Sequence, residues 1–138
     1  LPSFANPSGK GIICTNFMYD YRKIGFQFFD DNFRYYYFYD KKDVVNIDGD
    51  GGKIYPWYYT TSPDSIKLQI GHPYLNPWSY ILNRKSLILK KLSHKKGLLE
   101  STYQCTIKVS EHEFLKELHN IQKAYQKELD LELKANKI

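Results

Sequence analysis

The sequence predicts one α+β domain: an antiparallel meander of seven or eight strands, or a small β-barrel, followed by one C-terminal amphipathic helix. Two observations support this prediction. Residues 9–109 contain short aromatic and β-branched runs separated by clusters of Gly, Pro, Asn and Asp, a pattern typical of strands and turns. From Ser110 onward the apolar spacing changes from two residues to about 3.6, which is the period of a helix.

The aromatic segment at residues 24–39 predicts a hairpin that turns at Asp30-Asp31-Asn32, because Asp and Asn bond their own backbone in turns. The two-residue period of a strand predicts one face with Phe33, Tyr35, Tyr37 and Tyr39 and another with Arg34, Tyr36 and Phe38. Both faces carry large apolar area, so we expect a central strand that is covered on both sides. A ring platform for stacking sugars or bases is the alternative.

Further strands are expected at residues 10–17, 44–47, 54–61, 65–70, 78–82, 87–92 and 102–109. The segments 48–52 and 71–77 are expected to be loops because they are rich in Gly or Pro. Asn46, Asp48 and Asp50 match the first half of a calcium loop, but its last position holds Trp57 in place of Glu. An ordinary hairpin loop is therefore favoured, and no metal or other cofactor is expected.

The C-terminal segment predicts a helix over residues 111–134. Ser110 and Glu113 have the spacing of a capping box, which marks a helix start. The apolar stripe consists of Phe114, Leu118, Ile121, Tyr125 and Leu129. We expect this stripe to cover the second face of the sheet, and pairing with a partner helix is the alternative.

The N-terminus and the cysteines together predict export. Ser3-Phe4-Ala5 has the small-x-small form of a signal-peptidase site, so residues 1–5 are read as a signal-peptide remnant and residues 6–138 as the domain. An ordinary N-terminal tail is the alternative. In an oxidising compartment Cys14 and Cys105 would form one disulfide between the first and last strands. Two buried free thiols in a cytosolic protein remain the other reading.

The net charge of +5 comes from one segment. Residues 83–98 hold six basic and no acidic residues, whereas the chain before them is neutral. Clustered cations attract acidic partners, so we expect Arg84, Lys85, Lys90 and Lys91 to meet an acidic protein face or envelope component. Trp57 and Trp78 would supply apolar contact area. A solvated hairpin with a Lys-protected edge is the alternative.

The motifs for catalysis are missing. The chain has no G-x-S-x-G nucleophile motif, no glycine-rich phosphate loop before a helix and no histidines spaced four apart on a helix. Nucleic-acid binding is disfavoured because the basic residues lack interleaved aromatics. No stretch reaches the roughly 18 apolar residues of a membrane-spanning helix.

Several motifs carry a resemblance. The segments GKGIIC at residues 9–14, GFQF at 25–28, WSYILNRKSLIL at 78–89 and YQC at 103–105 resemble a group of short exported proteins of marine bacteria. This resemblance implies export, periplasmic or secreted, and the β-rich architecture, and it implies no activity. In plan the chain is also similar to periplasmic inhibitors of c-type lysozyme, small barrels with a cysteine near each end, although their Ser-Gly-x-x-Tyr loop is not evident here.

The predicted function is that of a non-enzymatic, exported binding protein, in one version an inhibitor. The alternatives are a carrier that holds a lipid-like or aromatic ligand inside the barrel, and an unrecognised hydrolase.

Overall fold

The computed structural model describes residues 6–38, 58–72, 75–93 and 97–135. It contains one eight-stranded antiparallel sheet and one helix, as the sequence predicts. The strands are β1 (Gly11–Asn16), β2 (Lys23–Phe28), β3 (Phe33–Phe38), β4 (Tyr59–Thr61), β5 (Ser65–His72), β6 (Leu75–Asn83), β7 (Ile88–Ser93) and β8 (Leu99–Lys108). The helix α1 spans Glu111–Ala135. The strands expected at residues 44–47 and the first part of 54–61 lie outside the described residues, as does the calcium-like loop.

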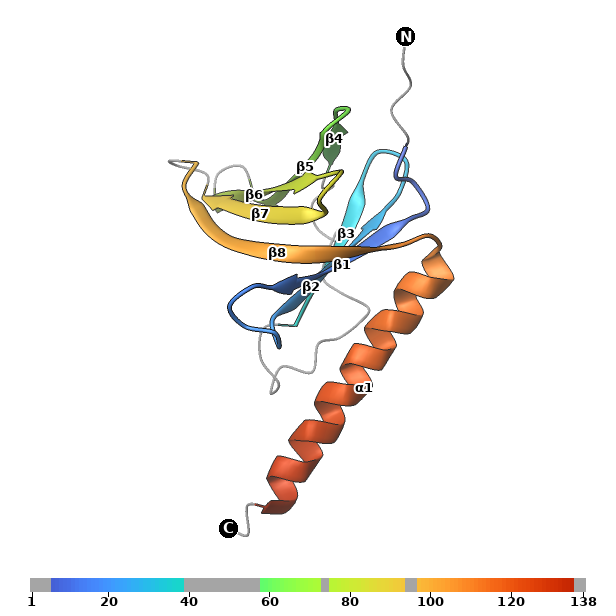
Figure 1. Cartoon of the computed structure of the whole chain (residues 1–138), viewed down its shortest axis with the longest axis vertical. Coiled ribbons are helices and arrows are strands. Elements are labelled where there is room, and N and C mark those ends of the chain that lie inside the picture. Colours follow the sequence, from blue (N-terminus) through green and yellow to red (C-terminus); the bar gives the residue numbers. More distant parts are fainter. Residues whose placement is uncertain (1–5, 39–57, 73–74, 94–96, 136–138) are drawn as a thin grey trace.

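The sheet curls into a half-barrel with the helix against its convex side (Figure 1). Its strand order is β3-β2-β1-β8-β7-β6-β5-β4, so the first and last strands pair in the middle. The two edges approach each other through a β-bridge between Asn32 and Tyr58. Next to it, the Tyr59 hydroxyl donates to the Phe29 carbonyl at 2.5 Å, which fastens β4 to the β2–β3 turn.

Two predictions about strand positions are wrong. β3 lies at the edge of the sheet and is not central, although both of its faces are covered because the sheet curls and α1 packs beneath it. The loop expected at residues 71–77 is shorter, since β5 continues to His72 and β6 begins at Leu75. A register shift between Ile70 and His72 accommodates this tight connection.

The concave face holds the larger of two cores. It is filled by aromatic and aliphatic side chains that include Phe26, Phe28, Tyr35, Tyr80 and Tyr103. Tyr35 and Tyr80 bring their hydroxyl oxygens to 3.3 Å, which pairs two polar groups inside the core. The described interior of the half-barrel is therefore packed with aromatic and aliphatic side chains.

The disulfide predicted from the sequence is present. Cys14 and Cys105 are direct partners in the β1–β8 register, with their Cα atoms 3.9 Å apart. The bond joins residues 91 apart in sequence, and the chain-entropy model assigns a loop of this length roughly 4–5 kcal/mol. Both half-cystines are buried, so the bond is part of the concave core.

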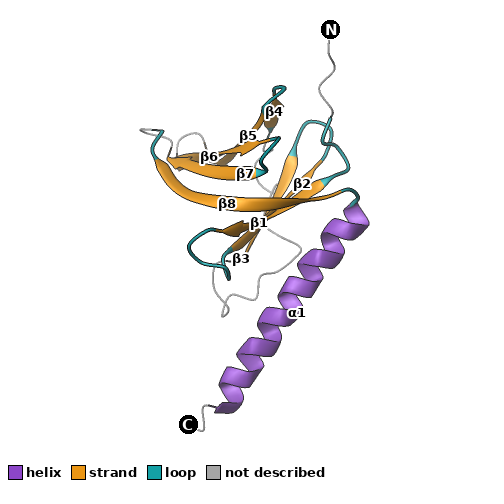
Figure 2. Cartoon of the chain, viewed as in Figure 1, coloured by secondary structure: helices purple, strands orange, loops and turns teal. Residues whose placement is uncertain are grey.

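The helix α1 lies against the convex face (Figure 2), and the second core lies between them. As predicted, Phe114, Leu118, Ile121 and Tyr125 are buried against the sheet, while Leu129 is half-buried. The Ser110 hydroxyl accepts from the Glu113 amide at 3.2 Å, which confirms half of the predicted capping box. The Glu113 carboxylate accepts from the Val109 amide instead of that of Ser110.

Two glycines make this docking possible. A Cβ atom on Gly11 would lie 2.3 Å from Cδ2 of Phe114, and one on Gly25 would lie 3.2 Å from its Cζ. Phe114 is completely buried, so its ring occupies a recess that exists only because two neighbouring strands lack side chains there.

Substituting Gly11 with Ala should therefore destabilise the fold. We expect the free energy of unfolding to fall by about 1–3 kcal/mol, as for overpacked cores, measured by urea denaturation. Gly25→Ala is the comparison: its new Cβ atom would lie further from the Phe114 ring, so the free energy of unfolding should fall by less. The double variant Gly11→Ala/Phe114→Leu should lose less unfolding free energy than the sum of the two single variants, because the smaller side chain makes room for the new methyl group. A loss equal to that sum would contradict a direct contact between the two positions.

Tyr125, near the end of the apolar stripe of α1, predicts that the fold loses stability at alkaline pH. Burial, followed by the Glu128 and Asp20 carboxylates, raises the pKa of Tyr125 to about 12, and its hydroxyl donates to the Tyr21 carbonyl. Because the folded pKa exceeds the unfolded value near 10, this contribution is complete below pH 10 and is lost as the pH rises through 12.

Tyr125→Phe should thus lower stability at neutral pH by about 0.5–1.5 kcal/mol, and the gap to the parent protein should close between pH 10 and 12. Urea midpoints at several pH values measure this. Tyr58→Phe, at a ring that is 58% exposed, is the control. A constant gap for Tyr125→Phe at all pH values would refute the assignment.

Candidate binding surfaces

The structure divides the predicted basic surface. Arg84 and Lys85 lie in the β6–β7 turn, whereas Lys90 and Lys91 lie on β7. Successive strand residues point to opposite faces: Lys91 pairs with Tyr80 of the concave core, and Lys90 pairs with Ile81 on the convex side. The four cations therefore do not form one surface. Trp57 lies outside the described residues.

Lys91 and Trp78 come together on the concave side. The Lys91 ammonium lies 5.2 Å from the centre of the Trp78 ring and 3.5 Å from the Glu100 carboxylate. Trp78 is half-buried and packs against the concave core. The charge of Lys91 is thus engaged with a ring and an acid, and its side chain is only 23% exposed.

Lys90 belongs to a row of side chains on the open part of the convex face. Thr60, Lys67, Ile81, Lys90 and Thr102 are direct partners across five consecutive strands, from β4 to β8. Lys67 and Lys90 are exposed and flank the half-buried Ile81. With neighbouring strands about 4.8 Å apart, the two lysines stand on either side of an apolar centre. We call this row the lysine row.

The adjacent row on the same face is also free of acidic residues. It runs from Ile88 through Gln104 and Thr15 to Lys23, and the Lys23 ammonium donates to the Thr15 hydroxyl at 3.0 Å. Sequence reasoning missed Lys67 and Lys23 as parts of a basic surface, because both lie outside the basic segment at residues 83–98. The strand register places Lys67 two strands from Lys90 in the same row, and Lys23 three strands away in the adjacent row.

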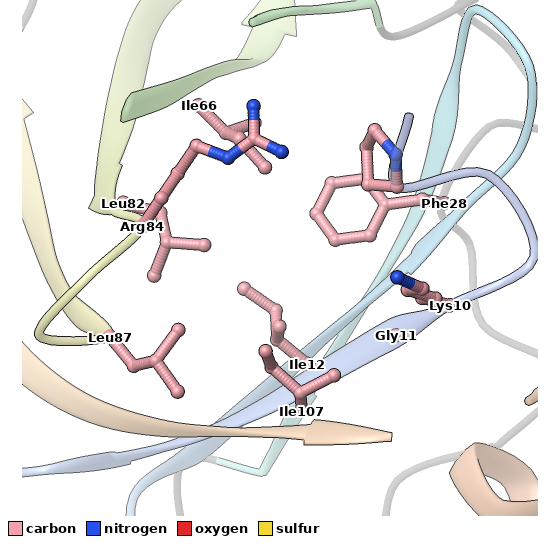
Figure 3. Close-up of a pocket in the computed structure, with 10 residues that line it drawn as sticks. Lys10, Gly11, Ile12, Phe28, Ile66, Leu82, Arg84, Leu87 and Ile107 are labelled. Atoms are coloured by element: carbon pink, nitrogen blue, oxygen red, sulfur yellow. The ribbon is translucent and has the colours of Figure 1, made fainter. Parts of the chain in front are cut away.

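A separate pocket opens at one end of the half-barrel, where several strands begin or end (Figure 3). Its volume is about 90 Å³. The apolar lining comes from Ile12, Phe28, Ile66, Leu82, Leu87 and Ile107, and the cations Arg84 and Lys10 complete it on opposite sides. Arg84 is thereby separated from its neighbour Lys85, which does not line the pocket.

One pocket residue has an unusual backbone. Leu87 has a φ of +58°, a left-handed conformation that costs an L-residue roughly 1–2 kcal/mol. The conformation is held from both sides: the Leu87 amide donates to the Asn83 carbonyl at 2.9 Å, and the Leu87 carbonyl accepts from the Cys105 amide at 2.9 Å. These bonds tie the β6–β7 turn to the disulfide strand and hold the Leu87 side chain against the concave core.

No group of three His, Cys, Asp or Glu side chains that could hold a metal ion occurs within the described residues. His112 and His119 lie on the exposed part of α1. Among the described helices, none is long and apolar enough to cross a membrane.

Comparison with known proteins gives no match: no family model, curated protein or solved structure is significantly similar to this chain.

The strain at Leu87 can be isolated by two substitutions. Both Leu87→Ala and Leu87→Gly remove the same apolar contacts, but glycine adopts positive φ without cost. We expect Leu87→Gly to be more stable than Leu87→Ala by about 1–2 kcal/mol, measured by thermal or urea unfolding. In ordinary strand positions the order is reversed, so a more stable alanine variant would disprove the strain.

Proposed function

We propose that this chain is a non-enzymatic binding protein that recognises an acidic face of a partner protein through its open convex surface. The observation that carries the proposal is the lysine row, in which Lys67 and Lys90 flank Ile81 and no acidic residue intervenes. An inhibitor of another protein would be one form of such binding.

The arrangement supports binding through both charge and shape. Isolated surface ion pairs contribute little, often below about 1 kcal/mol, so a single lysine would not define a partner. Two lysines around an apolar residue on a regular sheet can be matched by carboxylates around an apolar residue on the partner. Complementary charges of this kind increase the association rate and orient the encounter.

Export is part of the proposal. Disulfides persist in oxidising compartments and are rare in the cytosol, and the Cys14–Cys105 bond lies inside the concave core. The partner would then be an envelope or extracellular protein, and the proposal places this chain in the periplasm or outside the cell.

The experiment uses fluorescein-labelled poly-L-glutamate as a model acidic polypeptide, with binding followed by fluorescence anisotropy at 20 and 200 mM NaCl. The double variant Lys67→Glu/Lys90→Glu should weaken binding by at least about tenfold at low salt, since it reverses the two charges that face the probe. The difference between the parent protein and the double variant should shrink at high salt, because salt screens the charges of both proteins from the probe.

The matched control is Lys123→Glu/Lys127→Glu, which makes the same change in net charge on exposed positions of α1. It should retain most of the binding, as should Lys91→Gln on the concave side. An equal loss in both double variants would mean that net charge alone drives binding and would sink the proposal. Tighter binding to single-stranded DNA than to poly-L-glutamate would also count against an acidic protein partner.

A further inference from the structure

The pocket at the end of the half-barrel has the composition of a second binding site, distinct from the lysine row. We propose that it binds an aliphatic monocarboxylate, with the hydrocarbon chain in the apolar part and the carboxylate between Arg84 and Lys10. The aliphatic side chains of Ile12, Ile66 and Leu82 come from three different strands and converge on one space. Such a lining favours hydrocarbon over any polar group.

The charge of the pocket selects an acid. Among the described residues that line it, the two ionisable ones, Arg84 and Lys10, are both cationic, and none is acidic. The Arg84 Nη1 atom donates to the Ser62 carbonyl at 3.0 Å, which anchors the guanidinium across the gap between the β6–β7 turn and the β4–β5 turn. A guanidinium at the edge of an apolar pocket pairs with a carboxylate through charge-assisted hydrogen bonds, which are stronger than neutral ones.

The size of the pocket limits the chain. An enclosed apolar cavity of about 150 Å³ holds benzene, whereas this pocket has about 90 Å³. A short unbranched or branched chain therefore fits better than an aromatic ring. The concave core is filled by its own side chains, so we place the carboxylate of a bound acid at the rim. Figure 3 shows Arg84 and Lys10 on different sides of the apolar lining residues.

The backbone of Leu87 supports a functional role for this site. A costly left-handed residue is retained where the surrounding structure requires it, and such residues cluster at ligand sites. Here the conformation belongs to the residue that closes the pocket between Arg84 and Ile107. A glycine would adopt this φ more easily but would leave the wall open.

Binding of sodium hexanoate, measured by isothermal titration calorimetry and by methyl-resolved NMR, tests the proposal. The methyl signals of Ile12, Ile66 and Leu82 should shift with hexanoate and remain unchanged with hexylamine, which has the same chain and the opposite charge. From propanoate upward the affinity should rise about fourfold per methylene and then level off once the chain outgrows the pocket.

Arg84→Gln should weaken hexanoate binding by about tenfold, the effect of losing one charge-assisted hydrogen bond. Lys85→Gln, one position further along the same turn, is the matched control and should bind like the parent protein. Ile107→Phe should block the pocket from its exposed rim with little risk to folding, since Ile107 is 48% exposed. Lys67→Glu/Lys90→Glu should leave hexanoate binding unchanged.

Three results would overturn the proposal. Equal binding of hexanoate and hexylamine would show that Arg84 and Lys10 do not select a carboxylate. Methyl shifts confined to residues outside the pocket would place the acid elsewhere. An absence of shifts at millimolar hexanoate, in protein whose spectrum shows it to be folded, would exclude the site.

Discussion

The contact between Phe114 and the glycines of β1 and β2 determines how the two halves of the molecule meet. A helix with an apolar stripe can lie on many sheets, but a ring that enters a recess has one position along the strands and one depth. Gly11 and Gly25 lie on adjacent strands and admit the same ring. That single ring sets the register between α1 and the sheet, and Leu118, Ile121 and Tyr125 follow at helical spacing.

Once α1 is docked, the two faces of the sheet have different roles. The helix covers the convex side of β1–β3, where Ile13, Tyr36 and Phe38 contact it, and it leaves the convex side of β4–β7 open. The concave side is filled by its own rings. Within the part of the chain that the structure describes, the lysine row lies on the uncovered strands and the pocket at the end of the half-barrel.

The sequence predicted most of the architecture because its signals are local. The period change at Ser110, the Asp30-Asp31-Asn32 turn and the alternation of Trp78, Tyr80 and Leu82 each depend on a few neighbouring residues. The edge position of β3 could not be predicted, since strand order depends on pairing between distant segments. For the same reason the basic surface was only partly predicted: Lys90 and Lys91 are neighbours in sequence and lie on opposite faces, while Lys67 and Lys90 are far apart in sequence and share a row.

The pairing of β1 with β8 has a consequence for biogenesis. β1 pairs with β8, whose residues 99–108 come last in the sheet. The middle of the sheet can therefore form only after the other strands have been synthesised. Contacts of such large sequence separation slow folding. Under the export that we propose, Cys14 would enter the oxidising compartment before Cys105. A chain cut short before Cys105 would keep Cys14 as an unpaired thiol, so the disulfide distinguishes a chain that contains both central strands from one that lacks β8.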